Sequence, residues 1–130
     1  MTPPSTIAAF TFAVLIAVAV CFQIALAAGS PWGTLAWGGK FPGRLPKTMR
    51  FASIASALLL LALGAVVLAR AEVTLTSLYP LARTLIWAVV AYCALGIVTN
   101  AITPSPSERI IWLPVTILLL ISSLVVAFGP

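Results

Sequence analysis

Hydrophobic and polar positions alternate along this chain in long blocks rather than residue by residue. Four apolar runs, at residues 7–28, 51–69, 84–102 and 110–128, each contain 19 to 22 residues and no ionisable side chain. At about 1.5 Å of rise per residue, a helix of this length crosses the roughly 30 Å hydrocarbon core of a bilayer. A helix also satisfies its own backbone hydrogen bonds, as lipid requires. The pattern therefore predicts four transmembrane helices.

Composition leads to the same class of protein. Of the 130 residues, 62% are hydrophobic and only 7% are charged, and the mean hydropathy is +1.20. Soluble domains carry about 25% charged residues. The chain leaves little room for a soluble domain, so we expect one all-α, four-helix transmembrane bundle, an integral membrane protein with spans at about 7–28, 51–69, 84–102 and 106–128.

The longest polar interruption, Gly29 to Arg50, has an unusual composition. It holds five glycines, three prolines, no acid, two tryptophans (Trp32 and Trp37) and four basic residues (Lys40, Arg44, Lys47 and Arg50). A connector between adjacent helices needs only about 2–8 residues. The excess predicts a loop that folds back on the membrane face, against Asn100 and the segment 105–108. The loop is either an interfacial connector with tryptophan anchors or a partly re-entrant loop whose glycine amides and cations bind an anionic lipid head group or substrate.

The distribution of basic residues predicts how the chain lies in the membrane. The first and third loops hold five basic residues, namely Lys40, Arg44, Lys47, Arg50 and Arg109, whereas the opposite side holds only Arg70 and Arg83. Positive residues favour the cytoplasmic side. We therefore expect a multi-pass protein of the inner (plasma) membrane, with loops 29–50 and 103–109 cytoplasmic and both termini outside. The same charges favour anionic lipid, whereas nucleic acid is excluded as a partner because no soluble basic face exists.

Small residues recur at every fourth position of the first run, forming a ridge at Ala9, Ala13, Ala17, Cys21 and Ala25. Such ridges let membrane helices approach closely, so we expect this one to face the bundle or a partner subunit. The fourth run contains the fewest small or polar residues, and we expect its helix to face lipid most.

The third loop contains a helix-start pattern, Ser105-Pro106-Ser107-Glu108. The pattern predicts a capping box, in which Ser105 is the N-cap residue and Glu108 reaches back to the amide of Ser105. Pro106 would occupy the first helical position, and Pro114 should bend the helix. Glu108 is also the only acid on the basic side of the protein, where Lys40, Arg44, Lys47 and Arg50 are possible ion-pair partners.

Reactive groups are scarce in this chain. It has no His and no Asp, and its only acids are Glu72 and Glu108. Metal sites, proton relays and general acid–base catalysis rely on such groups. We therefore expect no enzyme, cofactor or metal. A lipid-modifying enzyme that uses Glu108 and the basic loop is the weakest alternative.

Two amides and two thiols lie inside the apolar runs. Gln23 and Asn100 are expected at similar depth near the cytoplasmic side, where they either form an interhelical hydrogen bond or line a polar pocket below the first loop. Cys21 and Cys93 are expected to be packing residues, and a disulfide between them is left open.

The two loops on the basic side carry a resemblance to a known group of proteins. The residues concerned are Gly29-Ser30-Pro31-Trp32-Gly33, Ala36-Trp37-Gly38-Gly39, Leu45-Pro46, Arg50, Asn100, Thr103-Pro104-Ser105, Glu108-Arg109, Trp112 and Pro114. In these positions the chain resembles small bacterial integral membrane proteins of four helices with a Gly/Trp-rich first loop and no assigned activity. The resemblance implies a four-helix inner-membrane protein and no catalytic residue.

Two functions follow as hypotheses. The first is a non-enzymatic scaffold or accessory subunit, which forms a homo-oligomer or joins a membrane partner through small residues. The alternative is a small oligomeric transporter or channel, with a pathway lined by Gln23, Asn100 and the Gly29–Arg50 loop.

Overall fold

A computed structural model describes residues 3–130 as an all-helical bundle. Its helices are α1 (Pro4–Ala28), α2 (Lys47–Arg70), α3 (Tyr79–Ile102) and α4 (Pro106–Ala127), and its short 3-10 turns are η1 (Gly33–Leu35), η2 (Trp37–Gly39) and η3 (Thr76–Leu78). All four α-helices are long and apolar enough to span a membrane, with mean hydropathies between 2.0 and 2.6. The predicted fold class is confirmed.

Prolines set the starts of the helices, and each helix begins three to five residues before its apolar run. The second helix begins at Lys47, directly after Pro46, and the third begins at Tyr79, followed by Pro80. Proline suits the first turn because its missing N–H has no partner to lose there. Lys47 and Arg50, which we expected in the loop, therefore lie in the first turn of α2.

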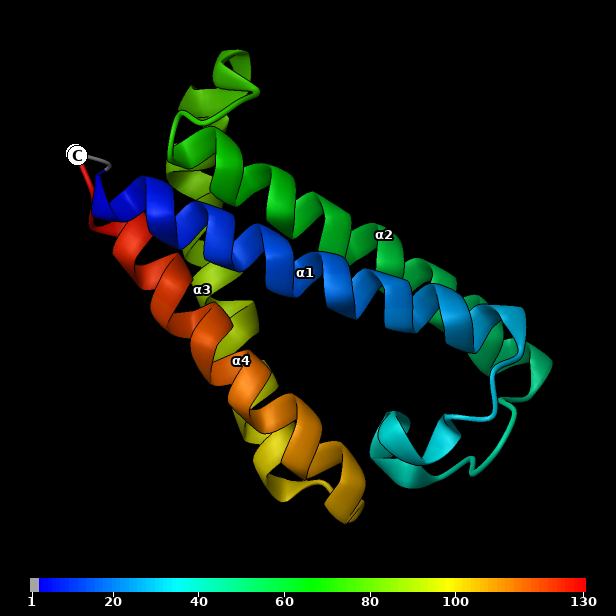
Figure 1. Cartoon of the computed structure of the whole chain (residues 1–130). Helices are drawn as coiled ribbons and strands as arrows, with labels where there is room; N and C mark the ends of the chain where they lie inside the picture. Colours follow the sequence, from blue (N-terminus) through cyan, green and yellow to red (C-terminus); the bar gives the residue numbers. More distant parts are fainter. Residues whose placement is uncertain (1–2) are drawn as a thin grey trace.

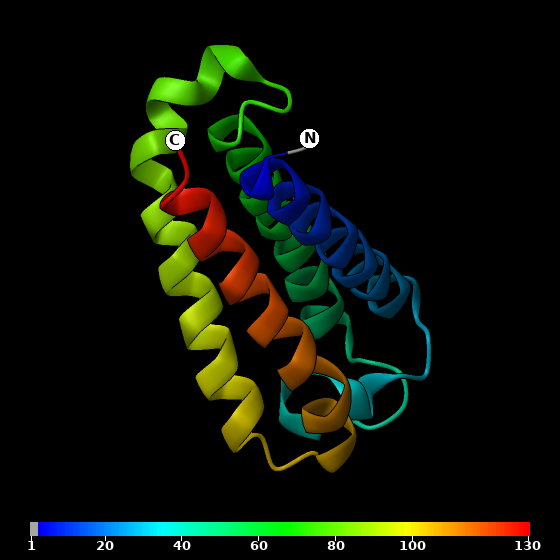
Figure 2. The same cartoon turned by 60° about the vertical axis from the view of Figure 1, so that its left-hand side comes forward.

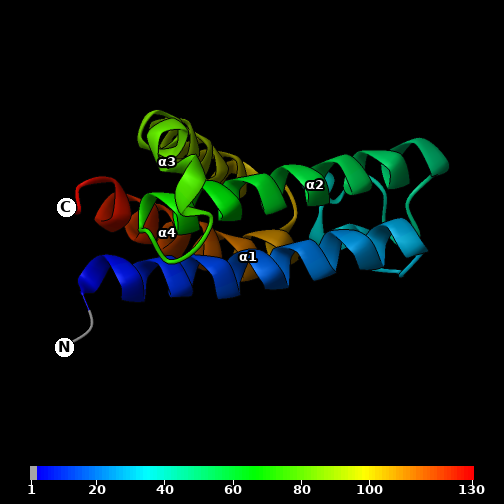
Figure 3. The same ribbon diagram turned by 90° about the horizontal axis from the view of Figure 1, so that it is seen from above.

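The helices pack in a ring in which each contacts its neighbours in the chain and α4 closes against α1. Figure 1 shows two antiparallel pairs, α1 with α2 and α3 with α4, which come together at one end and diverge toward the Gly29–Arg50 loop. The start of α1 and the end of α4 lie at the closed end, beside the connection between α2 and α3 (Figure 2). Seen from above, α4 lies next to both α1 and α3 (Figure 3). The bundle thus has a closed end and a splayed end.

The core is built from interdigitating aliphatic and aromatic side chains. Phe12, Ile86 and Val126 come from three different helices and are fully buried. Where the surroundings are lipid, such packing stabilises mainly through close van der Waals contact rather than through removal from water. The core therefore fixes how the two helix pairs meet.

The small-residue ridge of α1 only partly faces this core. Ala9 is buried, but Ala17 and Cys21 are exposed, and the buried stripe consists of Phe12, Ile16 and Val20. The expectation that the ridge faces the bundle is wrong for its middle part, and its alternative, a partner subunit, stays a prediction.

The helix most exposed on its outside is α3, not α4. In the most apolar window of each helix, 17% of residues are buried in α3 against 28% in α4. Ser122, Ser123 and Val126 of α4 pack inside the bundle, because serine is small enough for a close approach of helices. The expectation that α4 faces lipid most is therefore wrong.

Arg70 has a structural role that charge counting alone did not indicate. Its side chain is buried at the closed end and donates hydrogen bonds to the carbonyl oxygens of Ala127 (3.2 Å), Gly129 (2.9 Å) and Pro130 (3.2 Å). Its guanidinium also lies 5.7 Å from the centre of the Tyr79 ring. A cation at a helix C-terminus satisfies orphan carbonyls and complements the helix dipole. Arg70 therefore ties the end of α4 to α2.

We expect Arg70→Met to lower the free energy of unfolding by about 1–3 kcal/mol, because the buried carbonyls of α4 lose their donor. Unfolding in mixed micelles with increasing SDS measures the change. The matched control is Arg83→Met, which removes an exposed arginine from the same end and should change stability by no more than about 0.5 kcal/mol. Equal effects of the two substitutions would contradict the capping role.

A cavity beneath the Gly29–Arg50 loop

The Gly29–Arg50 loop has a compact structure of its own. The Gly33 N–H donates to the carbonyl of Gly43 at 2.8 Å, and Leu26, Ala36 and Leu45 form a small buried cluster beneath it. A Cβ atom at Gly33 would lie 1.8 Å from the Phe41 carbonyl oxygen, so only glycine fits there. Gly33 is therefore required by a close contact between backbone segments, whereas the other four glycines of the segment adopt positive φ.

The loop folds back onto the first turns of α4. Ser105 Oγ donates to the carbonyl of Thr34 at 2.5 Å, and Trp112 Nε1 donates to the carbonyl of Leu35 at 2.9 Å. A third bond joins the Gly38 N–H to Glu108 Oε2 at 3.2 Å. The expected contact between the loop and the segment 105–108 is confirmed, and the docked loop lies between the open ends of the two helix pairs (Figure 1).

The predicted capping box forms only by half. Ser105 Oγ accepts a hydrogen bond from the Glu108 N–H at 3.2 Å, so Ser105 is the N-cap residue as predicted. The Ser105 N–H, however, donates to Thr103 Oγ1 at 3.2 Å rather than to Glu108. The carboxylate of Glu108 instead meets the Gly38 amide, because the docked loop brings this donor to the start of α4.

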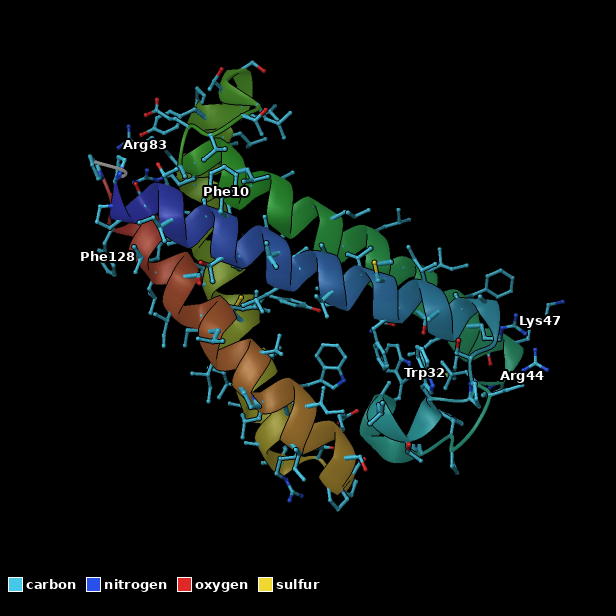
Figure 4. The ribbon with its side chains drawn as sticks, viewed as in Figure 1. Phe10, Trp32, Arg44, Lys47, Arg83 and Phe128 are labelled. Atoms are coloured by element: carbon cyan, nitrogen blue, oxygen red, sulfur yellow. The ribbon has the colours of Figure 1, made fainter. Side chains whose placement is uncertain are left out.

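The basic residues near this end mostly bind backbone carbonyls at the ends of helices. Arg44 Nε donates to the carbonyl of Gly29 at 2.9 Å, and Arg50 Nε donates to that of Ala27 at 2.8 Å, both at the end of α1. Arg109 binds the carbonyl of Thr103 at 2.7 Å, at the end of α3. Lys40 and Lys47 are exposed, and Figure 4 shows Lys47 and Arg44 together at the outer edge of the splayed end. Among residues 3–130, none of the basic side chains forms an ion pair with Glu108.

A cavity of about 330 Å³ lies beneath the loop and is lined by all four helices. Its walls are mainly apolar, with contributions from Ile16, Leu60, Leu63 and Leu119. Its polar and aromatic lining residues are Phe22, Gln23, Trp37, Ser56, Tyr92, Thr99, Asn100, Glu108, Trp112 and Thr116. The cavity therefore joins an apolar body to a set of polar groups.

Gln23 and Asn100 both line the cavity but do not bind each other. Asn100 Nδ2 donates to the carbonyl of Gly96, one turn earlier in its own helix, at 2.9 Å. Within the described part of the chain, the buried oxygen of Gln23 and the buried indole nitrogen of Trp37 have no hydrogen-bond partner. The expected interhelical hydrogen bond is wrong because the cavity separates the two helix pairs here.

Aromatic rings connect the loop to the cavity wall. The ring of Phe22 lies 4.8 Å from that of Trp112 and stacks on Trp32 with ring centres 6.4 Å apart. Trp32, expected as a membrane anchor, thus also packs on α1. Trp112 lies one helical turn after Glu108, so the two residues share one face of α4.

The two cysteines are free and lie in different surroundings. Cys93 is buried and lines the cavity, so its expected packing role is confirmed. Cys21 is exposed on α1, so its packing role within this chain is wrong. The disulfide that the sequence left open does not form between these two residues.

Carboxyl groups are scarce in the cavity. Glu108 is its one ionisable carboxyl group, and among residues 3–130 no cluster of three His, Cys, Asp or Glu side chains could hold a metal ion.

Searches against protein-family models, curated proteins and solved structures find no match for this chain. The resemblance to small bacterial four-helix proteins therefore stays a prediction.

Gly33→Ala should open the loop, since the added methyl group would overlap the Phe41 carbonyl. The expected result is faster cleavage by trypsin after Lys40 and Arg44 in lipid nanodiscs, followed by mass spectrometry. Gly43→Ala is the matched control: Gly43 has a φ of +79° but no atom within 4 Å of the added carbon, so only modest strain of about 1 kcal/mol is expected. Equal cleavage of Gly33→Ala and the parent protein would contradict the tight packing of the loop.

Proposed function

We propose that this chain is a small, non-enzymatic integral membrane protein that binds a small amphipathic molecule in the cavity beneath its first loop. The observation that carries the proposal is the cavity of about 330 Å³, which all four helices line. Pockets for small molecules begin at about 300 Å³ and combine apolar walls with a few polar groups. This proposal develops the transporter alternative, because the lining includes Gln23, Asn100 and part of the loop.

The chemistry of the lining supports an amphipathic ligand. Leucines from α2 and α4, such as Leu63 and Leu119, suit an apolar body. Gln23, Asn100 and Glu108 suit a polar head, and the unpaired oxygen of Gln23 is available to a donor. Hydrogen bonds with such groups orient a ligand that apolar contacts alone would leave mobile.

The closed end of the bundle favours binding over continuous conduction. Phe12, Ile86 and Val126 are fully buried there, and the helix pairs come together (Figure 1). A molecule in the cavity therefore meets a packed core on one side and the docked loop on the other. Transport by this protein would require the two helix pairs to move relative to each other.

The exposed part of the α1 ridge supports a second function, that of a scaffold or accessory subunit. Ala17 and Cys21 are exposed within a single chain, and small residues at this spacing permit close helix contacts.

If two copies meet here, mild oxidation of native membranes should yield a disulfide-linked dimer through Cys21. Cys21→Ser should abolish the dimer and Cys93→Ser should not, whereas a band of single chains in every sample would contradict self-association along this ridge.

The orientation and the lipid preference follow from the exposed charges. We place loops 29–50 and 103–109 in the cytoplasm and both termini outside, because most basic residues lie on the side of these loops. A reporter fused after Pro130 tests this orientation, because it shows on which side of the membrane that end of the chain lies. Lys40 and Lys47 are exposed and available to anionic head groups, at about 1 kcal/mol for each basic residue near the surface.

The test of the binding function is a photolabelling experiment in lipid nanodiscs. The probe is a neutral benzyl diazirine with a tert-butyl group, and the labelled peptides are mapped by mass spectrometry. We expect saturable labelling of the peptides that contain Gln23, Asn100 and Trp112. Ser56→Phe, which places a ring on the cavity wall, should reduce this labelling severalfold.

The matched control is Ala55→Phe, which adds the same ring to the neighbouring, exposed position of α2. This variant should keep the labelling of the parent protein, because its ring points away from the cavity lining. Labelling that does not saturate, or that falls equally in both variants, would argue against a binding cavity.

A further inference from the structure

We propose that the ligand of the cavity is a lipophilic organic cation and that Glu108 is its counter-charge. This inference rests on the proposed binding function and names the class of molecule that is bound. The juxtaposition that carries it is a buried carboxylate without an ion-pair partner beside several aromatic rings, all on the wall of one cavity.

The carboxylate of Glu108 is nearly enclosed. The residue is 8% exposed, and within residues 3–130 its carboxylate accepts one hydrogen bond, from the Gly38 N–H at 3.2 Å. A buried charge is costly unless it is paired and hydrogen-bonded. The first turn of α4 helps, but a helix N-terminus supplies only about half of a positive charge. Glu108 therefore leaves negative potential in the cavity that a cation would neutralise.

The neighbouring cations are held elsewhere. Arg44 and Arg50 donate to carbonyls at the end of α1, and Arg109 donates to the carbonyl of Thr103. Despite the formal net charge of +5, no Lys or Arg lines the cavity. The exposed charges of the rim are screened by salt beyond about 8–10 Å. An anionic ligand would thus meet an unfavourable interior.

Aromatic residues line the same cavity as the carboxylate. Trp112 follows Glu108 by one turn on the same face of α4, and the ring of Phe22 lies 4.8 Å from that of Trp112. Trp37, next to the Gly38 donor, also lines the cavity. Aromatic faces attract a cation that approaches within about 6 Å of the ring centre, and the attraction grows when the cation is desolvated.

The apolar walls decide which kind of cation fits. Small metal cations require several oxygen ligands and give up water reluctantly, and the cavity offers a single carboxylate. Leu60, Leu63 and Leu119 instead suit the hydrocarbon part of an organic ammonium ion. The structure therefore favours a substituted ammonium with an apolar body over an inorganic ion.

Two photoprobes of equal shape test the inference in lipid nanodiscs. One is the neutral benzyl diazirine with a tert-butyl group, and the other carries a trimethylammonium group in its place, so that the two differ only in charge. We expect the cationic probe to label the cavity peptides and Glu108→Gln to raise its half-saturating concentration about thirtyfold or more, as expected when one partner of a buried charge pair is lost. The neutral probe should change by less than about twofold, because apolar burial does not depend on the charge.

Two features of the chain make the comparison specific. The Gln side chain keeps an oxygen for the Gly38 N–H, so the loop contact is retained, and undiminished labelling by the neutral probe reports an intact cavity in the variant. Glu72→Gln is the matched control, since Glu72 is the other acid, is exposed and lies at the closed end. It should leave the labelling by both probes unchanged.

The outcomes separate the inference from the function on which it rests. The inference of a cationic ligand is overturned if the neutral probe labels the cavity and the cationic probe does not. It is also overturned if Glu108→Gln leaves labelling by the cationic probe unchanged. In both cases the proposed binding function stands. If neither probe gives saturable labelling, both are overturned. If Glu108→Gln weakens the labelling by both probes equally, Glu108 acts only by holding the loop in place. This result would also overturn its role as counter-charge.

Discussion

The carbonyl groups at the ends of the helices impose the constraint on which much of this structure depends. They have no partner within the helix, so side chains, other backbone groups or water must satisfy them. Arg44 and Arg50 satisfy the end of α1, Arg109 satisfies that of α3, and Arg70 satisfies that of α4. Backbone amides also contribute: the Val73 N–H donates to the Leu68 carbonyl at the end of α2, and the Ser30 N–H donates to the Ala25 carbonyl at the end of α1, both at 3.0 Å.

This use of arginine determines the electrostatics of the cavity. Because the guanidinium groups bind helix ends, they are not available to Glu108, and the loop supplies only the Gly38 amide. The glycines of the loop permit this approach: a Cβ at Gly39 would lie 2.9 Å from Cβ of Ser105. The same contacts that hold the loop in place thus leave a carboxylate beside aromatic rings on the cavity wall, which is why we infer a cationic ligand.

A large part of the fold could be predicted, but less of the site. The four helices followed from the length of the apolar runs, the N-cap at Ser105 from local spacing, and the folded-back loop from its excess length. The partner of Glu108, the roles of the arginines and the outward position of Ala17 and Cys21 could not be predicted. Each of these side chains had several candidate partners of the same chemical type. Helix periodicity alone also does not say which face of a helix packs against which neighbouring helix.

The sequence by itself determined the properties that arise within short segments. Hydrophobicity and backbone hydrogen bonding act over one helix, so they fix the number, length and capping of the helices. Only the tertiary structure decided that the helix pairs diverge, that a cavity lies between them and that the loop forms part of its wall. These features depend on contacts between distant positions, such as Gly38 and Glu108, which are 70 residues apart. Their meeting is set by the packing of all four helices together, which no local pattern encodes.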